Sequence, residues 1–237
     1  MVGRGATMIV DLPTIFELEA EALEVGVRRH PALGPLLASS SAVSPAGELR
    51  AAYLRYLKVT ADYVKHTVPM LRAAAEALRD GDEEDRLWHE RFMGYAAGET
   101  DPEAGYGHQV WALDDMRALG AHAGFLDAPA HERVDAYGSY FVDEARRHPY
   151  AILGAKGVLE HLSLRIADPM AAGVRASDIP NAANAVTFLA HHGVLDIDHV
   201  RAGDGYVTEL QPQKRDQVVH GAYFTSGCYR TFLRYCI

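Results

Sequence analysis

The chain has 237 residues and a formal net charge of −9, because 32 Asp and Glu outnumber 23 Lys and Arg. Hydrophobic residues make up 49% of it, and this composition excludes a largely disordered chain. The acidic balance argues against nucleic acid or an anionic membrane as a partner. No stretch approaches the roughly 20 apolar residues of a membrane-spanning helix. The short apolar run before Asp11 is not a secretory signal.

The two cysteines indicate a reducing compartment. Cys228 and Cys236 lie eight residues apart in a segment of helical character. Two turns of helix separate them by about 12 Å, which is too far for a mutual disulfide. We therefore expect a cytoplasmic protein. No internal repeat or change in composition divides the sequence, so residues 1–237 are predicted to form one helical domain.

Apolar residues recur at helical spacing along nearly the whole chain, and strand-like alternation is scarce. The predicted helices span residues 14–29, 46–78, 81–98, 102–119, 131–146, 149–167, 179–200 and 207–237. Pro69 predicts a kink in the second of them. Asp101, Pro102 and Glu103 supply an N-cap acceptor, a proline at the first helical position and an acid in the first turn. The sequence therefore predicts an all-α bundle of seven to nine helices.

One predicted helix carries two histidines and a carboxylate on a single face. His192, Asp196 and His199 follow one another at i, i+4 and i+7, so they lie within about 60° around the helix. A single His on a helix is usually solvated or a satisfied core group. Three coordinating side chains among apolar neighbours need a partner, and this set suits iron, zinc or manganese. His191 lies about 100° away from the stripe.

Two further elements offer ligands. Glu160 lies in ILGAKGVLEHLSLRI, which is apolar around much of its circumference, and an unpaired carboxylate there would be costly. Lys156, one turn earlier, could pair with Glu160 or with a substrate carboxylate, although a helical Lys is usually solvated. His108 shares a helix with Trp111 and can point inward, but alone it is most simply a stray His on an amphipathic helix.

With these residues in place, the sequence resembles the heme-oxygenase-like diiron oxidases and oxygenases. These iron-containing redox enzymes share a helical bundle with heme oxygenase and the thiaminase-like proteins. The phrases HPYAILGAKGVLEHL and FLAHHGVLDIDHV look like stretches of that family. The resemblance covers about residues 53–234, and His-x3-Asp-x2-His is its most specific part. It implies two ferrous ions per chain, with Glu160, 32 residues before His192, as a ligand.

The first ligand pair departs from the family pattern. Members often read Glu-Glu-x-Gly-His or Glu-x6-His, whereas here Gly105 stands three residues before His108 and Asp101 stands seven before it. The best fit matches AGET with the Glu-rich half and GH with the His half. Glu99 is then the first ligand, and Asp101 and Glu103 remain alternatives. If no carboxylate reaches the metal from this region, one iron site would be labile or absent.

The resemblance implies an O2-dependent oxidoreductase that uses an external electron donor. Our leading expectation is N-oxygenation of an amine or amino-heterocycle to a hydroxylamine or nitro product in a biosynthetic pathway. One alternative is oxidative C–C cleavage of an amino acid, or nitrile formation from it, at the same site. A metal-free thiaminase-like enzyme or cofactorless oxidase on the same fold is another, and a non-catalytic helical module is a third. The thiaminase type needs a Cys nucleophile, and both cysteines lie in the last ten residues.

A second stripe of polar residues predicts a substrate pocket. Tyr56, Tyr63 and His66 lie at i, i+7 and i+10, and together with Lys156 they would face a cavity. A Tyr-rich stripe is more often part of the core. No long apolar channel is evident, which favours a small polar substrate over a fatty acid. By analogy with similar bundles we also expect a homodimer.

Overall fold

The segments with helical spacing form helices in the computed structural model, which describes residues 11–38, 45–100 and 107–237. The helices are α1 Leu12–Arg29, α2 Gly34–Leu37, α3 Ala46–Val64, α4 Thr67–Leu78, α5 Glu83–Gly98, α6 Gln109–Ala118, α7 Ala123–Leu126, α8 Glu132–Arg147, α9 Ala151–Ala176, α10 Thr187–Thr208 and α11 Pro212–Leu233, with 3-10 turns η1 Ala182–Asn184 and η2 Arg234–Cys236. Nine of the helices in the described ranges have ten or more residues. The all-α prediction is confirmed.

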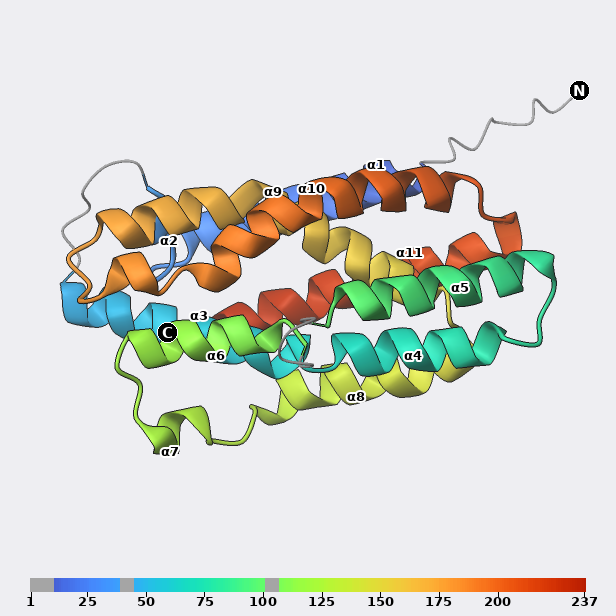
Figure 1. Cartoon of the computed structure of the whole chain (residues 1–237). Helices are drawn as coiled ribbons and strands as arrows, with labels where there is room; N and C mark the ends of the chain where they lie inside the picture. Colours follow the sequence, from blue (N-terminus) through green and yellow to red (C-terminus); the bar gives the residue numbers. More distant parts are fainter. Residues whose placement is uncertain (1–10, 39–44, 101–106) are drawn as a thin grey trace, which may run out of the picture.

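Helix α9 is the central element of the bundle. Fourteen of its 26 residues are buried, and it packs against α1, α10 and α11 (Figure 1). Two glycines let α9 and α11 touch backbone to backbone. A Cβ at Gly154 would collide with the Val218 carbonyl oxygen, and one at Gly221 would collide with that of Ala151. Because α9 is fixed from several sides, a side chain on it has a well-defined position.

The predicted kink at Pro69 is displaced by one turn. The long segment divides into α3 and α4 at Lys65 and His66, four and three residues before the proline. Pro69 has no N–H to donate to the Lys65 carbonyl, and its ring crowds that oxygen. The helix therefore breaks where the hydrogen bond is missing rather than at the proline itself.

Three other helix boundaries also differ from the prediction. Helix α9 continues through Pro169 to Ala176, because residues behind the proline, such as Val174, are buried in the core. Helix α10 begins only at Thr187, after the left-handed Asn181 (φ 62°) and the turn η1. It then runs to Thr208, and Pro212 at the first position of α11 marks the boundary. In each case tertiary packing or a turn overrides the local apolar pattern.

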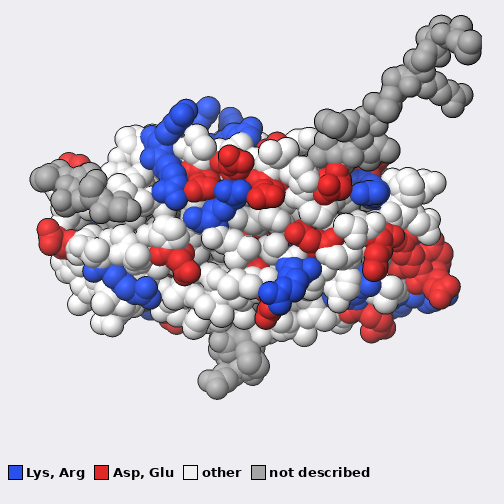
Figure 2. All heavy atoms as spheres, turned by 90° about the horizontal axis from the view of Figure 1, so that it is seen from above, with Lys and Arg blue, Asp and Glu red and all other residues white. Residues whose placement is uncertain are grey.

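Surface charges are mixed, and acidic residues gather where α5 begins. Figure 2 views the molecule from above and shows basic and acidic side chains close together over much of this face, with acidic ones concentrated at its right-hand end. The first turn of α5 alone contains Glu83, Glu84 and Asp85. Negative side chains at a helix N-terminus are favoured by the helix dipole. None of the helices in the described ranges has the length and apolar character that crossing a membrane requires.

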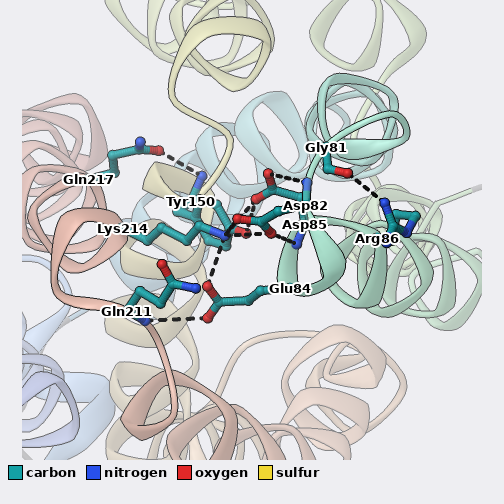
Figure 3. Close-up of polar contacts among 9 residues, drawn as sticks. All are labelled: Gly81, Asp82, Glu84, Asp85, Arg86, Tyr150, Gln211, Lys214 and Gln217. Carbon is teal, nitrogen blue, oxygen red and sulfur yellow. Dashed lines mark hydrogen bonds and ion pairs between the residues drawn. The ribbon is translucent and has the colours of Figure 1, made fainter.

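A partly buried lysine joins this acidic turn to the start of α11. The Lys214 Nζ lies 2.7 Å from Asp85 Oδ1 and 2.8 Å from Glu84 Oε2. The Tyr150 hydroxyl, just before α9, donates to the same Asp85 oxygen at 2.7 Å (Figure 3). Burial alone would raise the pKa of Asp85, but the hydrogen bonds from Lys214 and Tyr150 outweigh it and lower this pKa. The cluster thus fastens three helix N-termini together.

We expect Lys214→Met to destabilise the fold by about 2 kcal/mol at neutral pH, between the cost of a surface pair and a buried one. Folding lowers the pKa of Asp85. The stability that this carboxylate contributes is therefore present above its pKa in the unfolded chain and is lost as pH falls through its pKa in the folded protein. Folding raises the pKa of Lys214. The stability that this ammonium contributes is therefore present below its pKa in the unfolded chain and is lost as pH rises through its pKa in the folded protein. The difference in the free energy of unfolding between the unaltered protein and Lys214→Met should therefore be largest between about pH 4 and pH 10.

Urea unfolding across this pH range measures the loss in free energy of unfolding. Lys65→Met is the matched control, because Lys65 forms an exposed pair with Asp135 at 2.8 Å and should contribute less than about 1 kcal/mol. Equal effects of the two variants would show that the Lys214 cluster is no more than a surface ion pair.

Candidate metal centre

Glu99 and His108 lie at the facing ends of two helices. Glu99 directly follows α5, and His108 directly precedes α6. An isolated β-bridge between Thr100 and Gly107 joins the two ends. The Glu99 Oε2 is 3.2 Å from the His108 Nδ1. The pairing therefore depends on how two helices meet, not on spacing along one helix.

Helix α10 presents its ligand stripe toward this pair. The His192 Nδ1 lies 3.0 Å from the Phe188 carbonyl oxygen, so this nitrogen carries the proton and Nε2 is left to act as a ligand. The start of α10 is held by Asp115 of α6. Its carboxylate, fully buried, accepts the main-chain N–H groups of Thr187 at 2.8 Å and Phe188 at 2.9 Å.

Helix α9 contributes Glu160 and Lys156 from the opposite side. The Glu160 Oε1 lies 3.1 Å from the His199 Nδ1 and accepts a hydrogen bond from the Lys156 ammonium. The Lys156 Nζ also lies 4.6 Å from the Tyr95 ring centroid, a cation–π contact. Burial lowers the pKa of Lys156 to about 8, although Glu99 and Asp196 oppose this shift.

Two groups of potential ligand atoms result, and one residue belongs to both. Glu99, His108 and His192 form the first group, and Glu99, Glu160 and His199 form the second; within each group the ligand atoms lie within 4.8 Å of one another. Glu99 therefore lies between two candidate metal positions. A carboxylate has two oxygens and can serve a metal with each.

The burial and protonation of these groups fit a metal. The Nδ1 atoms of His108 and His199 are buried, and each lies 3.1–3.2 Å from a carboxylate oxygen of the ligand groups without the geometry of a hydrogen bond within the described residues, so these nitrogens remain free to bind a metal. Burial lowers the pKa of His192, so its ring is neutral near pH 7, as a metal ligand must be. Burial would raise the pKa of Glu99, but His108 and Lys156 lower it to about 2. The donor set of imidazole and carboxylate suits iron.

The remaining predicted ligands have different places. Asp196 belongs to neither group of three, but its side chain is only 4% exposed and lies 3.4 Å from the His199 Nδ1. Asp101 and Glu103, the alternative first carboxylates, lie outside the described residues. The exposed His191 belongs to neither group and packs its ring 4.4 Å from that of Trp111.

A cavity of about 120 Å³ extends from the ligand groups into the bundle. Of the predicted pocket residues, Tyr56, Tyr63 and Lys156 line it. His66 does not; it lies against α8, with Nε2 3.4 Å from Asp135 Oδ1, because the break before α4 turns it away from the stripe.

The wall of this cavity is more apolar than the small polar substrate expected from the sequence would suggest. This wall is largely aliphatic and aromatic, and many of its members come from α9, such as Ile152, Leu162 and Ile166. The sequence shows only that this helix is apolar around much of its circumference, and such a pattern does not separate a cavity wall from a filled core.

That Trp111 and Asp115 belong to the site is not predicted from the sequence. Trp111 stacks on His108 with ring centroids 4.1 Å apart, and it lies 5.7 Å from His192. It fixes the orientation of the His108 ring as Asp115 fixes the start of α10. A sequence signal for Trp111 existed in its i, i+3 spacing from His108. Asp115 stands beside Asp114 in the sequence, and such an acidic pair on a helix is more typical of a solvated face.

Comparisons with known proteins agree with this geometry. A sequence model of a family described as iron-containing redox enzymes matches residues 51–228, three quarters of the chain. The chain therefore belongs to this family.

A comparison with solved structures identifies the fold. A crystal structure from Shewanella denitrificans OS217, titled as a domain of unknown function with a heme oxygenase-like fold, is similar with a TM-score of 0.75 and 18% identity, over 96% of this chain and 92% of that chain. This likeness shows that the all-α bundle is heme oxygenase-like, as predicted. No match was found among curated proteins.

Proposed function

We propose that this iron-containing redox enzyme is a non-heme diiron oxygenase. In this proposal it uses O2 and an external electron donor to oxidise a small nitrogen-containing metabolite, by N-oxygenation of an amine or amino-heterocycle toward a hydroxylamine or nitro product. The observation that carries the proposal is the position of Glu99, which is shared by two groups of imidazole and carboxylate ligands. A carboxylate between two such groups can serve a metal with each of its oxygens, which supports a two-metal site.

The residues of the chain would divide the work at such a site. Glu99, His108 and His192 would hold one ferrous ion, and Glu99, Glu160 and His199 the other, with Asp196 beside them. Together the two ions would supply electrons to dioxygen. The Phe188 carbonyl keeps the His192 ring oriented. The apolar cavity excludes water and places the substrate against the ligand groups.

Lys156 has a positioning role in this proposal. Its hydrogen bond to Glu160 limits the orientations that this carboxylate can adopt, and the Tyr95 ring holds the ammonium from the other side. Because it already has these partners, Lys156 is poorly placed to pair with a substrate carboxylate. This supports amine oxidation over cleavage of an amino acid.

A Cys-dependent mechanism has little support. Neither cysteine is among the described residues that line the cavity, and burial raises the pKa of Cys228 and raises that of Cys236 to about 12. A thiol with a raised pKa is a poor nucleophile at neutral pH. The metal-free thiaminase-like alternative therefore ranks below the oxygenase.

Anaerobic ferrous titration followed by mixing with oxygenated buffer tests the proposal. We expect uptake near two irons per chain and a transient visible absorption band whose formation or decay a nitrogen-containing substrate accelerates. His192→Ala should lose the band. Asp198→Ala is the matched control, since this side chain is 86% exposed on the same helix, and it should behave as the unaltered protein. Absence of specific iron uptake would refute the oxygenase, and uptake of one iron would refute the two-metal site.

A further inference from the structure

The far end of the cavity differs in chemistry from the end at the ligand groups. The lining carboxylates and His192 belong to the ligand groups and their surroundings, and the rest of the wall is mostly aliphatic or aromatic, with hydroxyls of Thr67 and Ser163. Four tyrosines, Tyr56, Tyr63, Tyr137 and Tyr229, belong to this aromatic part of the wall. The body of a substrate whose nitrogen reaches the ligand groups would lie among these side chains.

The tyrosine hydroxyls already have partners within the protein. The Tyr137 hydroxyl lies 3.2 Å from the Thr225 Oγ1, and Tyr56 hydrogen-bonds with Tyr229. Burial raises the pKa of Tyr56 to about 12 and that of Tyr63 well above its usual value, so these phenols are neutral. A satisfied, neutral hydroxyl neither requires nor strongly attracts a charged group. The far end therefore acts as an apolar chamber.

Positive charge is also lacking there. Among the described residues that line the cavity, Lys156 is the single Lys or Arg, and it pairs with Glu160 at the ligand end. A second charged group on the body of the substrate, such as the carboxylate of an amino acid, would be buried without a counter-charge. Proteins rarely tolerate that arrangement because its desolvation is not compensated.

The size of the cavity sets a further limit. At about 120 Å³ it is comparable to an engineered apolar cavity of roughly 150 Å³ in another protein that binds benzene. A body of about one aromatic ring, or a branched alkyl group of similar volume, would fill it. A long chain would not fit without displacing the wall.

We infer that the substrate is an amine with a compact, uncharged apolar body, and that the apolar chamber rejects amines carrying a second charge. This inference rests on the proposed function for the position of the nitrogen and narrows its substrate class. It replaces the small polar substrate expected from the sequence. Ala167 is the specificity position that the inference singles out, because it is 1% exposed and its small side chain forms part of the cavity wall.

Calorimetric titration with two matched amines tests the inference. We expect 4-methylbenzylamine to bind and 4-(aminomethyl)benzoate, which replaces the methyl by a carboxylate, to bind about 100-fold more weakly. Ala167→Leu, which fills the chamber, should weaken binding of 4-methylbenzylamine by at least about tenfold. Ala172→Leu makes the same change at an exposed position of the same helix and should leave binding unchanged.

Several outcomes would overturn the inference. These are no binding of 4-methylbenzylamine, equal binding of the two amines, or full binding by folded Ala167→Leu. If Ala167→Leu does not fold, Ser163→Leu tests the same wall from a half-buried position, and the comparison of the two amines needs no variant. Each titration is made on metal-free and on anaerobic ferrous-loaded protein. Absent iron uptake would then refute the proposed function alone, whereas absent discrimination between the amines would refute this inference alone.

Discussion

Glu99→Gln is expected to weaken both iron sites at once, whereas His192→Ala and His199→Ala should each weaken one. The reason is that Glu99 belongs to both ligand groups and the two histidines belong to one each. The pKa of Glu99 is held at about 2, so the wild-type side chain is an anion at any pH near neutral. Glutamine keeps the shape but removes the charge that offsets the two cations.

The expected loss is large. Removing a residue that only supports a ligand commonly costs 10–100-fold in metal affinity, so neutralising a shared ligand should cost at least about 100-fold at each site. The measurement is anaerobic ferrous titration with iron counted per chain. We expect close to two irons for the unaltered protein, one for each histidine variant and none retained by Glu99→Gln.

Glu90→Gln is the control, because Glu90 is exposed on the same helix α5 and should keep full iron uptake. Retention of one iron by Glu99→Gln would mean that Glu99 serves a single metal. In that case Asp101 or Glu103, outside the described residues, would be the remaining candidates for the shared carboxylate.

The parts of the site that lie on one helix could be predicted from the sequence. His192, Asp196 and His199 follow the helical period, and helix geometry alone places them on one face. Glu160 could be singled out because an acid in an apolar helix needs a cation. The structure brings His192 and His199 into the two ligand groups and Glu160 into one of them.

The parts that depend on the meeting of helices could not be predicted in this way. Glu99 and His108 lie at the ends of α5 and α6, joined by one bridge, and no periodicity relates them. Only the resemblance to the family brought Glu99 forward as a ligand. The cavity is a property of how α3, α4, α9, α10 and α11 fit together, so its apolar character became visible only in the assembled fold.

The second large effect is expected from Asp115→Ala, which should destabilise the protein by about 3 kcal/mol. Asp115 acts as an N-cap supplied by another helix, since its two oxygens accept the N–H groups of Thr187 and Phe188 at the start of α10. Alanine would leave both donors unpaired, the one of Phe188 buried and the one of Thr187 partly buried. Loss of an ordinary N-cap costs about 1 kcal/mol, and each buried unpaired group costs about 1–3 kcal/mol.

The same substitution should also act on the metal site at a distance. Phe188 is the residue whose carbonyl orients the His192 ring, so fraying of the first turn of α10 would release that ring. We expect iron affinity at the first ligand group to fall by about 10-fold, as for other residues that orient a ligand. Affinity at the second group should change little, because His199 lies two turns further along α10.

Asp114→Ala separates this role from a general effect of charge. Asp114 is the preceding residue, pairs with Arg117 at 2.5 Å and is 58% exposed, so its loss should cost less than about 0.5 kcal/mol. Urea unfolding gives the free energies, and ferrous titration gives the two affinities. If Asp115→Ala lost the stability but kept both affinities, the cap would support the helix without controlling the ligand. If stability were also unchanged, the donors of α10 would have found other partners, and the link between α6 and the metal site would be refuted.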